Sequence, residues 1–242
     1  MKSPVIVSTI ERRLLVNYRL DPEAAARVLP RGMRPDLATG YAVGGICLIR
    51  LSGVRPPGVP GRCGLRTENA AHRIAAVWDT PSGPQRGVYI PRRDTSSGLT
   101  ALLGGRVFPG EQHRARFDVR EGLDRMCVGF RSGDGATSAA VEVRPAGRWA
   151  GSLLFDDLET ASLFFRDAPV GFAARDSGSE LDGVHLGTGD DWQVLPTELI
   201  SVESTYFGDD ARFPRGTAFP DSALLMRDMA ASWSARPVPS CC

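Results

Sequence analysis

The chain has 242 residues, and its 42% apolar and 24% charged content is that of an ordinary folded protein rather than a disordered one. Its 29 basic and 28 acidic residues give a formal net charge of +1, which excludes a domain-scale basic field for nucleic acid or an anionic membrane. Lys2 is the only lysine, so the sequence predicts no lysine amine inside the fold.

The predicted elements, in chain order, are mostly strands that follow one another as hairpins. Apolar or alternating runs predict strands over residues 13–19, 41–51, 72–78, 86–90, 115–119, 126–130 and 137–144, with further strand-like segments over 171–206. Helical spacing and capping aspartates or serines predict helices over 21–29, 99–103, 156–165 and 223–233. Hairpins without β-α-β units indicate an α+β fold with an antiparallel sheet or distorted barrel.

The predicted core follows from these strand registers. We expect five strand residues to be largely buried and two helix residues to pack the helix onto the sheet. They are Val16, Ile46, Val77, Val88 and Phe117 on the strands, and Leu163 and Phe164 on the helix over 156–165. No linker is long enough to divide the chain, so we expect one domain over 1–242 with a flexible tail over 235–242.

The sequence contains no motif that indicates a cofactor, a metal or a membrane. The apolar run over 5–10 is shorter than the core of a signal peptide, and no window is apolar for 18 residues, so we expect a cytoplasmic protein. Five cysteines at irregular spacings form no Cys-x-x-Cys pair and no zinc cluster, which indicates reduced thiols. Cys241 and Cys242 are interpreted as part of a tail without function.

Three local clusters are candidates for binding or chemistry. Each of the three histidines is interpreted first as a surface or hydrogen-bonded structural residue, but His113 lies close to the acid Glu111. Arg92 and Arg93 end a predicted strand before a helix, where they would bind a carboxylate or phosphate, or form an exposed basic pair. Glu68 lies between a Gly/Pro loop and a strand, where it would be either a buried acid/base group or a solvated loop acid.

The first half of the chain resembles the acetoacetate-decarboxylase-like superfamily, and most of all its bacterial branch of domains of unknown function. The similarity covers residues 12–131 well and the remainder in outline. It is carried by the order and spacing of residues 16–23, 28–33, 41–46, 50–55 and 87–90, the last followed by Asp94. The resemblance implies a strongly curved antiparallel sheet that is nearly closed into a cone or barrel, with helices packed outside and a small-molecule cavity.

The resemblance also implies a chemistry that this chain lacks. In that superfamily a lysine that follows an aromatic-proline step forms a Schiff base with a β-keto acid, and acetoacetate decarboxylase is a standard example of such an activated lysine. Phe108-Pro109 is the step that corresponds best here, and Gly110, Glu111 and Gln112 follow it. Glu68 resembles a pocket glutamate of the family, Arg12 lies within one residue of its pocket arginine, and a second family glutamate falls near Gly45 and is absent.

These residues lead to a functional hypothesis and an alternative. The hypothesis is a non-decarboxylating enzyme that performs dehydration, aldol or retro-aldol cleavage, enolisation or cyclisation on a small keto-acid or polyketide-like substrate, without a cofactor or metal. Glu68, Glu111 and His113 would exchange protons, and Arg12, Arg92 and Arg93 would bind the substrate. The alternative is a non-catalytic protein that binds a small molecule on the same scaffold. In either case we expect a homo-oligomer, because hairpin-rich sheets leave edges to be covered.

Overall fold

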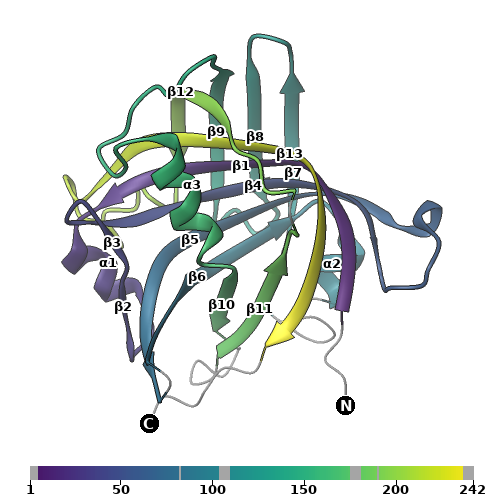
Figure 1. Ribbon diagram of the computed structural model, residues 1–242, viewed down its shortest axis with the longest axis horizontal. Coiled ribbons are helices and arrows are strands. Elements are labelled where there is room, and N and C mark those ends of the chain that lie inside the picture. The colour runs from purple at the N-terminus through teal and green to yellow at the C-terminus, as the bar shows by residue number, and fades with distance from the viewer. Residues whose placement is uncertain (1–4, 82, 104–109, 175–180, 190, 237–242) are drawn as a thin grey trace.

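The structure is a computed structural model, and it describes residues 5–81, 83–103, 110–174, 181–189 and 191–236. Strands dominate it, and the described strands belong to one large sheet (Figure 1). The strands are β1 (Val5–Leu20), β2 (Met33–Pro35), β3 (Leu37–Ala38), β4 (Tyr41–Arg55), β5 (Leu65–Thr80), β6 (Gly83–Thr95), β7 (His113–Glu121), β8 (Met126–Ser132), β9 (Ser138–Pro145), β10 (Val170–Ala174), β11 (Leu181–Gly187), β12 (Leu195–Ser204) and β13 (Ala218–Arg236). The helices are α1 (Pro22–Val28), α2 (Gly98–Leu103), α3 (Leu158–Arg166) and a 3₁₀ turn at Gly61–Cys63.

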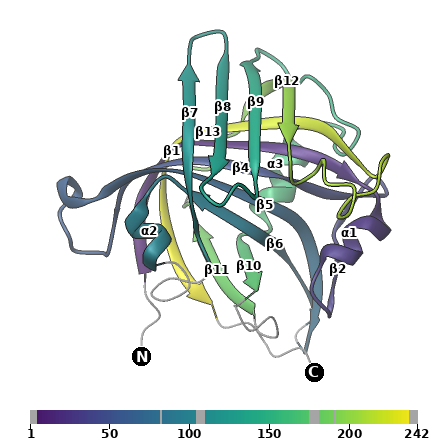
Figure 2. The same ribbon diagram turned by 180° about the vertical axis from the view of Figure 1, so that it is seen from behind.

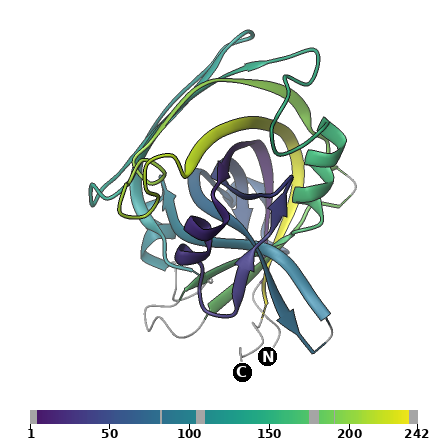
Figure 3. The same ribbon diagram turned by 90° about the vertical axis from the view of Figure 1, so that its left-hand side faces the viewer.

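The sheet closes on itself twice around a common set of strands. We call β13, β1, β4, β5 and β6, paired in that order, the shared wall. One ring is closed through β10 and β11, and the other through β7, β8, β9 and β12. Figure 3 shows how strongly β13 curves to reach both rings. The expected curved, nearly closed sheet is confirmed, but it is mixed rather than antiparallel, because β6 pairs in parallel with both β10 and β7.

The two faces of the shared wall carry separate hydrophobic cores. One face, which we call the α3 face, packs against α3 and is seen from the front in Figure 1. The opposite face packs against β7, β8 and β9, which stand in front when the molecule is viewed from behind (Figure 2). In β1 the split follows the strand period of two, since Leu14 and Val16 belong to the second core and Leu15 to the α3 face.

Only some of the predicted core residues are buried. Val16, Ile46 and Val77 are buried, as predicted. Val88 and Phe117 are half-buried. On α3 the prediction was out of phase, because Ala161 and Phe165 are its buried residues while Leu163 and Phe164 are half-buried.

Local turn and cap signals predicted several elements correctly. The β5–β6 hairpin closes at Thr80↔Gly83. Asp21 caps α1, because its side chain accepts a hydrogen bond of 2.9 Å from the backbone N–H of Ala24. Helix α3 is capped by Asp157 rather than by the residue before it. The residues that directly follow α2, from 104 to 109, lie outside the described part of the chain.

The helix predicted over 223–233 is wrong, since these residues are part of β13. The run Ala223–Met226 is fully buried, because β13 pairs with β1 and β12 and has a core on both faces. A strand covered on both faces shows no apolar alternation, and its Ala, Leu and Met content favours a helix. Strand β13 extends to Arg236, so residues 235–236 of the expected tail are strand residues, and 237–242 lie outside the described part.

None of the helices in the described residues has the length and apolar character that a membrane crossing requires. The same residues contain no group of three or more His, Cys, Asp or Glu side chains placed to hold a metal ion.

His72 differs from the expected surface or hydrogen-bonded histidine. It is fully buried, and its imidazole stacks on the ring of Tyr206 with 4.4 Å between the centroids. Neither ring nitrogen has a hydrogen-bond partner among the described residues. Burial, helped by the positive charges of Arg92 and Arg212, lowers the pKa of His72 to about 3.

We therefore expect His72 to make the fold sensitive to mild acid. The pKa of His72 in the folded state lies below its unfolded value near 6.5. The contribution of the neutral imidazole to the free energy of unfolding is therefore fully present above pH 6.5 and is lost as the pH falls toward 3. At pH 5.0 the loss is about 2 kcal/mol. Urea unfolding at pH 7.5 and 5.0 measures it, and His72→Phe, whose ring suits the aromatic surroundings, should flatten the difference. An equal loss in the variant would contradict this expectation.

Candidate functional site

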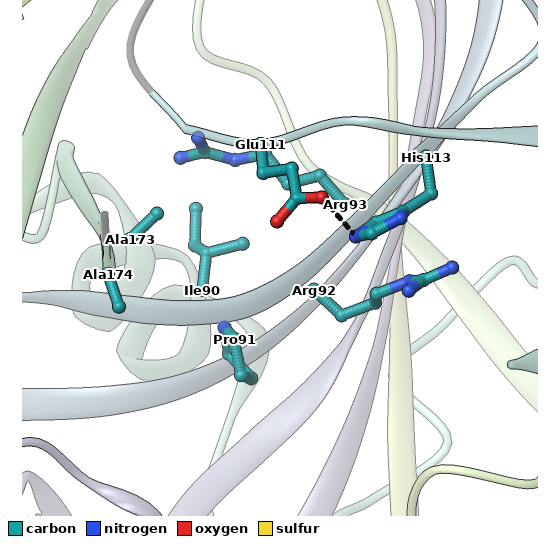
Figure 4. Close-up of a pocket in the computed structure, with 8 residues that line it drawn as sticks. All are labelled: Ile90, Pro91, Arg92, Arg93, Glu111, His113, Ala173 and Ala174. Atoms are coloured by element: carbon teal, nitrogen blue, oxygen red, sulfur yellow. Dashed lines mark ion pairs between the residues drawn. The ribbon is translucent and has the colours of Figure 1, made fainter. Parts of the chain in front are cut away.

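A pocket of about 170 Å³ lies where β6, β10 and the residues before β7 meet (Figure 4). Its lining combines apolar side chains with four charged or titratable ones. The lining residues are Ile90, Pro91, Arg92, Arg93, Glu111, His113, Ala173 and Ala174. The pocket therefore brings together two pairs that were singled out at different places in the sequence, Arg92 with Arg93 and Glu111 with His113.

The parallel pairing of β6 and β7 positions His113. Asp94 of β6 lies opposite His113 of β7 in this pairing. The imidazole of His113 lies between the carboxylates of Glu111 and Asp134. Its Nε2 is 3.7 Å from Oε1 of Glu111, and its Nδ1 is 3.5 Å from Oδ2 of Asp134. The Glu111 side chain is 60% exposed, whereas that of His113 is only 27% exposed. A histidine held between two carboxylates is suited to accept and return a proton.

Asp134 is the functional candidate that the sequence analysis missed. It accepts hydrogen bonds from the hydroxyl of Ser132 at 2.6 Å and from the backbone N–H of Ala136 at 3.0 Å. These bonds, and then Arg92, outweigh the effect of burial and hold the pKa of Asp134 well below its usual range. Asp134 is thus a permanent anion beside His113. The sequence marks it only as an aspartate between two turn glycines, 20 residues or more from the residues that line the pocket.

Arg92 and Arg93 point to different places, as successive residues of a strand do. Arg92 extends away from Ala173 and Ala174 (Figure 4), and its Nη2 lies 3.0 Å from Asp94 and 2.8 Å from Asp134. Two carboxylates therefore already match its charge. The Arg93 guanidinium runs past Glu111 toward the side of the pocket where Ala173 lies.

Gly110 gives the Arg93 guanidinium its space. Its φ of +87° favours glycine, and a Cβ at this position would lie 1.7 Å from Nη1 of Arg93 and 3.4 Å from Cβ of Ala173. Burial lowers the pKa of Arg93 to about 10, and the negative charge of Asp182 acts in the opposite direction. The guanidinium stays protonated at neutral pH, so it adds a positive charge to the lining of the pocket.

The other two predicted site residues, Arg12 and Glu68, lie in a different cluster. Arg12 is fully buried, and its Nη2 donates to Oε2 of Glu68 at 2.6 Å while its Nη1 donates to Oε1 of Glu121 at 2.7 Å. Arg50 pairs with the same two glutamates, and Arg227 contacts Glu121. Glu68 is thus held by two arginines, and neither Arg12 nor Glu68 lines the pocket.

The step compared with the family's lysine position, Phe108-Pro109, lies outside the described residues. Another proline, Pro91, lies in the wall of the pocket and is followed by Arg92 and Arg93. Neither arginine carries an amine, and a guanidinium is too weak a nucleophile to act as a lysine amine does.

Comparisons with known proteins agree with this fold. The family model DUF2071, described as an uncharacterized conserved protein, matches residues 8–166. Acetoacetate decarboxylase from Legionella pneumophila superposes with a TM-score of 0.61 at 13% identity, over 98% of this chain and 88% of that one. An acetoacetate decarboxylase-like enzyme from Sphingomonas wittichii gives a TM-score of 0.58 at 14% identity, over 98% and 94%.

A third solved structure is the enduracididine biosynthesis enzyme MppR complexed with pyruvate, with a TM-score of 0.55 at 16% identity over 98% of this chain and 90% of that one. No curated protein sequence matches the chain. At these identities the superpositions show the fold, while the family model covers more than half of the chain. The chain therefore belongs to the DUF2071 family and has the fold of the acetoacetate-decarboxylase-like superfamily.

Proposed function

We propose that this protein binds a small keto acid, or a related carbonyl compound, in the pocket and acts on it by general acid/base chemistry without a Schiff base. The observation that carries the proposal is the imidazole of His113, set between Glu111 and Asp134 at the edge of a pocket that also contains Arg93. The pyruvate complex of MppR, which has the same fold, supports a keto acid as the ligand class.

The simplest reaction for this arrangement is enolisation. His113 takes a proton from the carbon next to the substrate carbonyl, and the electrons of that C–H bond form the enolate. Arg93 donates hydrogen bonds to the enolate oxygen, while Asp134 stabilises the imidazolium from the Nδ1 side. Glu111, being exposed, exchanges the proton of Nε2 with water. Transfer of the proton to the enolate oxygen gives the enol, and its return to carbon regenerates the keto acid with an exchanged hydrogen. Where the substrate carries a β-hydroxyl group, that group leaves the same enolate and takes the imidazolium proton, so that water is released and the reaction is a dehydration.

Binding without turnover is the second candidate function. Four of the lining residues, Ile90, Pro91, Ala173 and Ala174, offer an apolar wall with no group that exchanges protons. An apolar wall beside one arginine is sufficient to hold a small acid. The experiment below separates the two functions.

Proton exchange tests the enzyme directly. In D₂O the wild-type protein should accelerate the exchange of the methyl protons of pyruvate and of the C3 protons of 2-oxobutyrate, followed by proton NMR. His113→Asn should slow the protein-dependent exchange by about 10²-fold or more, because it removes the group that takes the proton. His185→Asn is the matched control, since His185 lies on β11 and does not line the pocket.

Each outcome decides between the functions. Exchange at the wild-type rate in His113→Asn would remove the proposed role of His113. Saturable binding of the keto acids without any exchange would establish the binding protein instead.

The absence of a Schiff base is tested separately. Borohydride reduction in the presence of acetoacetate, followed by peptide mass spectrometry, should trap no adduct away from Lys2 and the N-terminus, because the sequence holds no other amine of this kind. An adduct elsewhere would contradict the proposed mechanism.

A further inference from the structure

Asp94 is a buried carboxylate beside the candidate site, and the mechanism above gives it no role. Its side chain is fully buried, and it stands opposite His113 in the parallel pairing of β6 with β7. The hydroxyl of Thr137 donates to its Oδ2 at 3.2 Å. A buried carboxylate is unfavourable unless a positive charge pairs with it, so its charged partner indicates what it does.

The charged partner of Asp94 is Arg92, which it shares with Asp134. Two nitrogens of the guanidinium contact Asp94, since Nη2 donates to Oδ1 at 3.0 Å and Nε donates to Oδ2 at 3.2 Å. The same Nη2 donates to Oδ2 of Asp134 at 2.8 Å. Burial would lower the pKa of Arg92, but the hydrogen bonds to Asp94 and Asp134 outweigh burial and raise it. One cation therefore lies between two anions.

Asp134 does not depend on Arg92 for its position. It lies in the turn between β8 and β9, where its carboxylate accepts a hydrogen bond of 2.6 Å from the hydroxyl of Ser132 and one of 3.0 Å from a backbone N–H of the turn. The turn itself is tied to β7, because the backbone N–H of Gly133 donates to the carbonyl of Arg114 at 2.7 Å. These neutral groups hold the carboxylate in place without help from a cation.

Arg92 and His113 therefore compete for the charge of Asp134. Oδ2 of Asp134 is 2.8 Å from the guanidinium and 3.5 Å from Nδ1 of the imidazole, so a guanidinium with no other partner would neutralise the carboxylate. Asp94 opposes this, because it matches the same guanidinium charge from a fully buried position. The two aspartates and one arginine keep one negative charge in excess, and that charge favours an imidazolium at His113.

We propose that Asp94 is a positioning residue for His113, because it holds the charge of Arg92 and so leaves Asp134 to bind the Nδ1 proton of the imidazole. Nε2 of the neutral ring then carries no proton and can take one from a substrate. Asp94 does not line the pocket, so it acts through the other two residues and not on a ligand there. The inference rests on the proposed function for its effect on turnover, whereas the position of the ring proton is measured without a substrate.

The first experiment locates the ring proton of His113 by ¹H–¹⁵N NMR of protein that is labelled at the imidazole nitrogens. The chain has three histidines, and comparison with His113→Asn identifies the signals of this one. Above the pH at which the ring loses its charge, the wild type should carry the proton on Nδ1. Asp94→Asn keeps the size of the side chain but removes its charge. It should move about half of the proton or more to Nε2, where Glu111 is the nearest carboxylate.

The second experiment follows the proton exchange of 2-oxobutyrate. Asp94→Asn should lower kcat by about 10-fold and leave KM nearly unchanged, because the imidazolium loses its anion while the lining of the pocket stays the same. Adding Arg92→Met to Asp94→Asn removes the competing cation, and it should restore kcat to within about 3-fold of the wild type. If Asp94 only supported the fold, the second substitution would lower kcat further.

Arg92→Met alone covers the case that Asp94→Asn does not fold. Its ring proton should stay on Nδ1 of the imidazole, since Ser132 still holds Asp134. A proton on Nε2 in the wild type or in Arg92→Met would overturn the proposal, as would an unchanged ring proton in Asp94→Asn or a double variant slower than Asp94→Asn. No exchange in any of the proteins would contradict the proposed function instead, and the NMR result would still decide on Asp94.

Discussion

Replacing Arg12 by methionine is expected to lower the free energy of unfolding by about 3–5 kcal/mol, the range seen when one partner of a buried ion pair is removed. Arg12 is fully buried, and it is the link between Glu68 of β5 and Glu121 at the end of β7. Without it both carboxylates stay partly buried with Arg50 and Arg227 as their remaining partners. Urea unfolding at pH 7 measures the loss.

The matched control is Arg144→Met, because the Arg144–Glu198 pair has side chains that are 56% and 38% exposed. An exposed pair of this kind contributes less than about 1 kcal/mol. Similar losses in the two variants would show that the Arg12 cluster does not stabilise the fold as a buried network.

The loss of stability at acid pH gives a second measure of the cluster formed by Arg12, Glu68 and Glu121. Burial alone would raise the pKa of Glu121, but the hydrogen bond and charge of Arg12, with Arg50 and Arg227, outweigh it and lower the pKa. The resulting stability is fully present above the unfolded-state pKa near 4.5 and is lost as the pH falls below it. The loss between pH 4.5 and 3 should be smaller in Arg12→Met than in the wild type.

Phe165→Ala is expected to lower the free energy of unfolding by about 3–5 kcal/mol, as other deletions of buried aromatic rings do. Phe165 is 5% exposed, and it joins α3 to the shared wall through the guanidinium of Arg73, 4.4 Å from the centre of its ring. Its ring also packs against that of Phe155, in the segment before α3, with 5.8 Å between the centroids. The neighbouring Phe164 is half-buried and stacks with Arg86 nearer the surface.

Phe164→Ala is therefore the control, and it should cost clearly less than Phe165→Ala in the same urea experiment. The reverse order would mean that α3 packs with the phase predicted from the sequence rather than with the phase found in the structure.

The features that the sequence predicted well are local ones. Asp21 and the glycine of the β5–β6 turn act within a few residues of themselves, so their effect is visible without knowledge of the fold. Strand β13 could not be predicted, because its apolar run becomes a strand only through partners that lie up to 229 residues away, as in the pairing of Val5 with Ser234.

In the candidate site, too, local features could be predicted from the sequence and contacts between distant residues could not. Arg92, Arg93, Glu111 and His113 were selected from local features, and the β6–β7 pairing brings them together. The contact of Asp134 with Arg92 spans 42 residues, and no local pattern indicates it. The reach of a long side chain across a strand, as in Arg73, whose guanidinium passes Gly45 of β4 to reach β1, is likewise a property of the assembled sheet.

Strand β13 has a further consequence during protein synthesis. Both rings include it, and it pairs with β1 from Val5↔Ser234 to Leu20↔Ala218. Neither ring closes before the last of the described strands has left the ribosome, and until then a long edge of β1 stays unpaired. Such an edge invites pairing with other chains. The nascent protein should therefore depend on chaperones until its final strand is released, and chains truncated before residue 218 should aggregate rather than fold.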